Sequence, residues 1–147
     1  MYLNSLYEEY DVDCEYNLNI DNENKRKAIY CIEQEYLRYK KEPTRKRIKN
    51  IDGEDHLEIS ILPDIIIHRR GENGSNHIIC EIKKSCNSYE SDYDRYKLKK
   101  YTEESSEFRY SIGLFITLYV DSDFARKSDI EEYENGEKTR NLTIAST

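Results

Sequence analysis

Two apolar stretches in the middle of the chain, separated by a short polar segment, predict a pair of adjacent strands. The string LEISILPDIIIH, which is apolar from Leu57 to Ile67, and HIICEIK, from His77 to Lys83, are both rich in β-branched residues. The segment RGENGSN between them is rich in Gly and Asn, which tolerate positive φ, so we expect a hairpin. Pro63 cannot donate a ladder hydrogen bond and is expected at an edge or a bulge, where it would re-aim Asp64.

The pattern on either side of this hairpin predicts helices and a further strand. A helix from about Asn22 to Lys41 would carry an apolar face made of four residues, Ile29, Ile32, Tyr36 and Tyr39. A second helix is expected from Ser91 or Asp92 to about Glu104, and FRYSIGLFITLYV after it is apolar enough for a central strand. The other expectations are a short helix over residues 1–9, a strand over 11–17, a loop over 44–55, and a short helix with a loose tail after 121. This order favours an α/β fold with a mixed central sheet flanked by helices.

Length and composition narrow the class of protein. A chain of 147 residues is most naturally one domain. No stretch approaches the ~20 apolar residues that a membrane-spanning helix needs, and no charged start followed by an apolar region indicates a signal peptide. We therefore expect a cytoplasmic protein without a membrane partner. The four cysteines lack the paired spacing of a zinc site.

Three charged residues of the predicted hairpin form the candidate catalytic set. Alternation along a strand places Glu81 and Lys83 on one face and Ile82 on the other, with Asp64 close by on the neighbouring strand. Asp64 and Glu81 interrupt apolar runs, where ionised groups are costly unless they are paired or bind a metal. The alternative is that Glu81 and Lys83 form an ordinary ion pair.

Two carboxylates beside a lysine suit metal-dependent hydrolysis of a phosphodiester. Mg²⁺ takes oxygen ligands and keeps several waters, so Asp64, Glu81 and the backbone carbonyl of Ile82 would be enough to hold it, with Mn²⁺ as a substitute. The metal lowers the pKa of its water and polarises the phosphate. Lys83 would orient the attacking water or balance charge in the transition state.

The same residues carry a resemblance to a known family. The order Pro63-Asp64, then Glu81-Ile82-Lys83, then a helix with Lys97, Leu98 and Tyr101 resembles the PD-(D/E)xK nuclease superfamily. The strings VDCEYN, PDIIIHRRG and EIKKS resemble small bacterial and phage members of it. The resemblance implies a restriction endonuclease-like fold over residues 1–120, with residues 121–147 as an acidic extension packed on or trailing from the same domain. It also implies that Asp64 and Glu81 bind the metal and that Lys83 is the catalytic lysine.

The resemblance has one departure, which keeps a second function open. Relatives begin with a helix whose glutamate reaches the metal site, and no position of this sequence matches that glutamate. We therefore expect a shortened N-terminal helix. A Mg²⁺-dependent nuclease acting on DNA is the first hypothesis. The alternative is a catalytically inactive nuclease-fold domain that binds nucleic acid or a protein partner.

Charge distribution bears on the expected nucleic-acid partner. A net charge of −7 argues against a general nucleic-acid coat, because phosphate contacts need lysine and arginine. Basic residues are nevertheless clustered, and four of them are expected to contact the DNA backbone, namely Arg69, Arg70, Lys97 and Lys100. The alternative is an ordinary solvated surface, and with it an interaction protein that has no nucleic-acid role. Many relatives act as homodimers, and nothing in the sequence identifies an interface.

Overall fold

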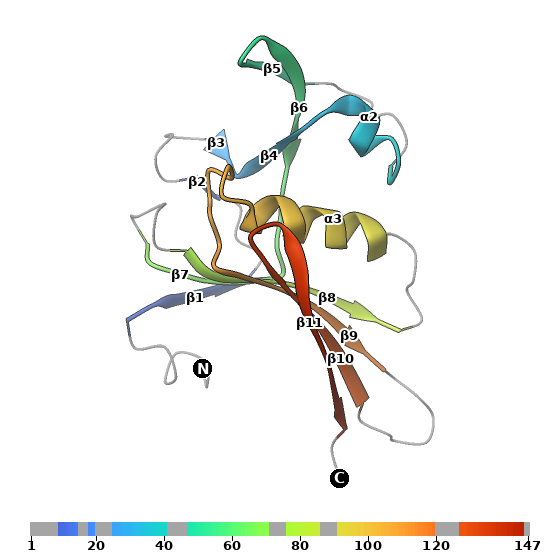
Figure 1. Cartoon of the computed structure of the whole chain (residues 1–147). Coiled ribbons are helices and arrows are strands. Elements are labelled where there is room, and N and C mark those ends of the chain that lie inside the picture. The colour runs from blue at the N-terminus through green and yellow to red at the C-terminus, as the bar shows by residue number, and fades with distance from the viewer. Residues whose placement is uncertain are drawn as a thin grey trace.

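Among the described residues, the largest sheet is a mixed sheet of six strands. The computed structural model describes residues 9–14, 18–19, 25–40, 47–70, 76–85, 91–119 and 127–145. The strand order is β1-β7-β8-β9-β10-β11 (Figure 1). The strands are β1 (Asp11–Cys14), β7 (Ile65–His68), β8 (Asn76–Lys84), β9 (Ile112–Leu118), β10 (Lys127–Glu134) and β11 (Glu137–Ala145). Strands β8 and β9 are parallel, and every other neighbouring pair is antiparallel.

Helix α3 (Ser91–Thr102) connects the two parallel strands and covers one face of the sheet. A parallel pair requires such a crossover. Leu98 and Tyr101 of the helix are fully buried in one core cluster with Phe115 of β9 and Tyr133 of β10. The close approach of helix and sheet depends on Gly113 of β9, since a Cβ there would lie 3.2 Å from Thr102 Cγ2.

A second, smaller sheet lies on the other side of α3 (Figure 1). Its strand order is β4-β6-β5, formed by β4 (Ala28–Cys31), β6 (Glu54–Ser60) and β5 (Ile48–Ile51), all antiparallel. The short helix α2 (Glu33–Tyr36) follows β4, and β2 (Leu18–Asn19) pairs with β3 (Lys25–Arg26). Ile29, Cys31 and Leu57 are buried in the same cluster as Leu98, so the helix packs between two sheets.

Several expectations from the sequence are confirmed. The protein is a mixed α/β fold with a mixed central sheet. Strands β7 and β8 form the expected antiparallel hairpin, α3 lies within the expected range, and β9 is a central strand. The expected N-terminal helix falls outside the described residues except for its last position, and β1 covers the first part of the strand expected after it. No helix in the described ranges has the length and apolar character needed to cross a membrane.

Four expectations were wrong. The segment expected as a helix over 22–41 contains strands β3 and β4, and among its described residues, 25–40, only Glu33–Tyr36 form an α-helix. Residues 48–51 and 54–60, expected to form a loop up to residue 55 and then the start of a longer strand, form the hairpin of β5 and β6. The apolar stretch from Leu57 to Ile67 is divided between two sheets, with Pro63 in the break. In place of the helix and tail expected after residue 121, the described residues 127–145 form the hairpin of β10 and β11, which extends the large sheet.

Candidate active site

Asp64 is held beside strand β8 by a backbone hydrogen bond. It lies directly before β7 and after the buried Pro63, where the chain enters the large sheet. Its Oδ2 atom accepts a hydrogen bond of 2.6 Å from the backbone N–H of Ile82. Ile65 pairs with Cys80, so Asp64 lies at the level of Glu81 on the neighbouring strand. The hairpin thus brings the two predicted metal-binding acids to one end of β7.

Glu81 and Lys83 both face helix α3, and each is paired there with a side chain of opposite charge. Glu81 Oε1 lies 2.7 Å from Lys97 Nζ, and Lys83 Nζ lies 2.9 Å from Asp94 Oδ2. Lys97 Nζ also lies 2.8 Å from Asp94 Oδ1. The three contacts form an open series, Glu81–Lys97–Asp94–Lys83, and we call these four residues, two from β8 and two from α3, the ion-pair square. Their alternating charges join the strand to the helix.

Burial shifts the proton equilibria of the ion-pair square. Glu81 is only 3% exposed, and burial raises the pKa of its carboxyl to about 7, against the lowering effect of Lys97. The carboxylates of Asp94 and Asp64 raise it further. For Lys83, burial lowers the pKa, but the hydrogen bond and charge of Asp94 outweigh burial and the net shift is upward. Lys83 therefore stays protonated at neutral pH.

Two carboxylate oxygens at the acidic end of the site could contribute to holding a divalent cation. Among the described residues, neither Asp64 Oδ1 nor Glu81 Oε2 takes part in a hydrogen bond. When Glu81 is ionised, the three carboxylates of Asp64, Glu81 and Asp94 outnumber the two ammonium groups of Lys83 and Lys97. The described part of the chain has no group of three acidic, histidine or cysteine side chains arranged around a metal position. Mg²⁺ is commonly bound through one or two protein carboxylates, with water and substrate oxygens as its other ligands, and Asp64 and Glu81 could supply the carboxylates.

The four predicted DNA contacts do not share one surface. Lys97 is buried against Glu81. Arg69 and Arg70 follow β7 at the end opposite Asp64, roughly 17 Å away along the strand. There Arg69 Nη2 lies 3.0 Å from Glu9 Oε2, and Arg70 is paired with Asp13.

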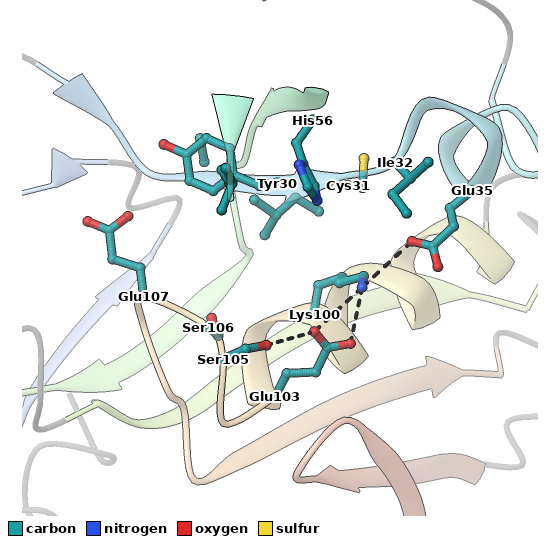
Figure 2. Close-up of a pocket in the computed structure, with 13 residues that line it drawn as sticks. Tyr30, Cys31, Ile32, Glu35, His56, Lys100, Glu103, Ser105, Ser106 and Glu107 are labelled. Carbon is teal, nitrogen blue, oxygen red and sulfur yellow. Dashed lines mark hydrogen bonds and ion pairs between the residues drawn. The ribbon is translucent and has the colours of Figure 1, made fainter. Parts of the chain in front are cut away.

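Lys100 borders a separate cavity between β4 and the C-terminal end of α3 (Figure 2). The cavity has a volume of about 280 Å³. Lys100 Nζ lies 3.2 Å from Glu103 Oε1 and 3.6 Å from Glu35 Oε2, so its charge is largely balanced within the protein. Residues of β4, including Tyr30 and Cys31, line the opposite side of the cavity (Figure 2).

Asp94 is the functional candidate that sequence reasoning missed. It is 4% exposed and contacts both lysines of the ion-pair square. A usable signal was present, because Asp94 lies three residues before Lys97 and shares a helix face with it. A carboxylate and a lysine at that spacing, on the helix that follows Glu81 and Lys83, predict a charged contact with the strand.

Comparison with known proteins adds no further assignment. No protein-family model matches the chain, and neither curated proteins nor solved structures give a match. The geometry of Asp64 and the ion-pair square is therefore the basis for a functional proposal.

Proposed function

We propose that the protein is a Mg²⁺-dependent nuclease that hydrolyses phosphodiester bonds in DNA. The observation that supports this most is the position of Asp64 beside Glu81, with the protonated Lys83 held near them by Asp94. We also propose a restriction endonuclease-like fold. Its support is the sequence of β1, the β7–β8 hairpin, the crossover helix α3 and β9, which carries the acids and the lysine in the order that the resemblance implies.

The residues of this site have separate roles in the proposed reaction. Asp64, Glu81 and the Ile82 carbonyl would hold the metal, which supplies an activated water and polarises the phosphate. Lys83 keeps its proton, so it serves as a fixed positive charge for the phosphoryl oxygens and not as a general base. Asp94 positions Lys83 by holding its ammonium group at 2.9 Å.

The test is DNA cleavage by the purified protein. We expect nicking or degradation with Mg²⁺ or Mn²⁺, complete inhibition by EDTA, and loss of turnover in Lys83→Ala without loss of the folded state. Lys84→Ala is the matched control, because Lys84 is the exposed next residue on the same strand. Metal-dependent cleavage that survives in an Asp64→Ala, Glu81→Ala double variant would refute the proposal.

One observation favours the second candidate, an inactive nuclease-fold domain that binds nucleic acid or a protein partner. The ammonium group of Lys97 already pairs with Glu81 at 2.7 Å, so this carboxylate has a charge partner without a metal. This candidate predicts DNA binding without cleavage on single-stranded, double-stranded and branched substrates. It also predicts no heat of Mn²⁺ binding in titration calorimetry.

A further inference from the structure

Lys97 is paired with Glu81, one of the two carboxylates that the proposed function assigns to metal binding. Its Nζ atom contacts Glu81 Oε1 at 2.7 Å and Asp94 Oδ1 at 2.8 Å, and the residue is 9% exposed. A buried carboxylate needs a partner of opposite charge, since leaving it alone is strongly destabilising. Lys97 supplies that charge to Glu81 when no metal is bound.

We propose that Lys97 is an internal counter-ion that a divalent cation must displace from Glu81, and that Asp94 retains the displaced ammonium group. The inference rests on the proposed function and adds how the same site is regulated. It makes metal binding an exchange of one cation for another at Glu81. The affinity for metal is then set by how firmly Lys97 holds this carboxylate.

Asp94 makes the exchange feasible inside the protein. Lys97 contacts both carboxylates at once, so it can release Glu81 and remain paired with Asp94 from its own helix. The ring of Tyr93 lies 5.6 Å from Lys97 Nζ and stabilises the ammonium group on that side. The four-carbon stem of a lysine allows such a movement without a change in the backbone.

Charge balance explains why displacement is needed. A divalent cation placed on Glu81 beside the ammonium group of Lys97 would put two cations on one buried carboxylate. Their mutual repulsion is strong at this depth, because water does little to screen it. Lys83 differs from Lys97 in one respect that matters here: its ammonium group contacts Asp94, and no contact with Glu81 is formed.

The experiment is Mn²⁺ titration calorimetry on the full chain in three forms, namely wild type, Lys97→Met and Lys83→Met. Removal of the counter-ion in Lys97→Met is expected to tighten Mn²⁺ binding about tenfold or more, whereas Lys83→Met changes it by less than about threefold. A thermal-shift measurement is the second readout. Lys97→Met without metal should unfold at a lower temperature than wild type, and Mn²⁺ should raise its unfolding temperature by more.

Each outcome decides between the two proposals. Equal Mn²⁺ affinity in wild type and Lys97→Met overturns the proposal that the metal displaces Lys97, but it does not contradict the proposed nuclease function. Equal tightening in both lysine variants shows general electrostatics and also overturns it. Absence of binding in all three forms overturns both proposals.

A further variant keeps the test valid if Lys97→Met does not fold. Lys97→Arg retains the charge, and its guanidinium can hold a carboxylate through two hydrogen bonds. The displacement model predicts weaker Mn²⁺ binding for Lys97→Arg than for wild type. Unchanged or tighter binding would overturn it.

Discussion

The buried carboxyl of Glu81 is expected to make the stability of the protein fall as pH rises. Its pKa is raised from 4.5 to about 7, chiefly by burial, against the effect of Lys97. The folded state therefore binds this proton more tightly than the unfolded chain. The resulting stability is fully present below pH 4.5 and is lost as the pH rises through about 7.

The magnitude follows from the two pKa values. At about 1.4 kcal/mol for each pH unit between them, ionisation of Glu81 costs the folded state about 3 kcal/mol. Glu81→Gln keeps the shape of the side chain and cannot ionise. We expect the variant to be within about 1 kcal/mol of wild type at pH 5 and more stable by about 3 kcal/mol at pH 8.

Urea unfolding of both proteins between pH 5 and pH 8 measures this difference directly. Glu104→Gln is the control, because Glu104 is exposed on the turn after α3. A difference between Glu81→Gln and wild type that does not grow with pH would contradict the reasoning. Greater stability of wild type at pH 8 would show that the Lys97 charge outweighs burial.

The remaining predictions concern the packing and the ion pairs around α3. Burial raises the pKa of Glu131, but hydrogen bonds from Arg95, Lys138 and Tyr133 outweigh burial and lower the pKa to about 2. The stabilisation of the fold by ionised Glu131 is therefore present above pH 4.5 and is lost as the pH falls toward 2. In urea unfolding, Glu131→Gln is expected to lower the free energy of unfolding by about 2 kcal/mol at pH 7 and by less at pH 3. Gly113→Val is expected to lower the free energy of unfolding by about 1–3 kcal/mol in the same assay, because the valine side chain would collide with α3. Unchanged stability would show that the helix can move away from β9. Gly136→Ala is expected to lower the free energy of unfolding by about 1 kcal/mol or more, because the backbone φ of Gly136 is +80° and a Cβ there would lie 2.8 Å from Glu103 Cγ. An unchanged urea midpoint would contradict this.

The parts of the fold with strong local signals could be predicted from the sequence. Strands β7 and β9 are almost entirely apolar, β8 contains the apolar run Ile78–Cys80 before Glu81, and α3 has the helical period. Two further hairpins also carry a local signal in the sequence. Asp52-Gly53 and Asn135-Gly136 are tight turns in which both residues have positive φ, which is the Asp-Gly and Asn-Gly pattern of two-residue hairpins.

The helix expected over 22–41 failed for a different reason. The spacing of Ile29, Ile32, Tyr36 and Tyr39 fits a helix, but Ala28, Ile29 and Cys31 are buried by pairing with β6. The backbone of Ile32 is extended, and the helix begins only after it. Contacts with a strand more than 20 residues away decided the structure of this segment, and no local pattern contains that information.

In the candidate site too, features set by local rules could be predicted from the sequence and features set by tertiary packing could not. Glu81 and Lys83 could be assigned to one face because strand alternation is a local rule. Their partners could not, since the position of Lys97 depends on how α3 crosses the sheet. Lys97 was therefore expected at a DNA backbone, although it lies in the interior against Glu81.

Strand β11 ends the large sheet with nine residues that are all exposed. Within the described residues, no strand pairs with its outer side, and Leu142 and Ile144 are 44% and 54% exposed. A rim of this kind offers backbone donors and acceptors to any extended peptide, including the same strand of another molecule. In concentrated solutions we therefore expect oligomers in which the β11 strands of two molecules pair. A proline introduced in place of Thr143 would reduce them, because proline removes a donor from the rim.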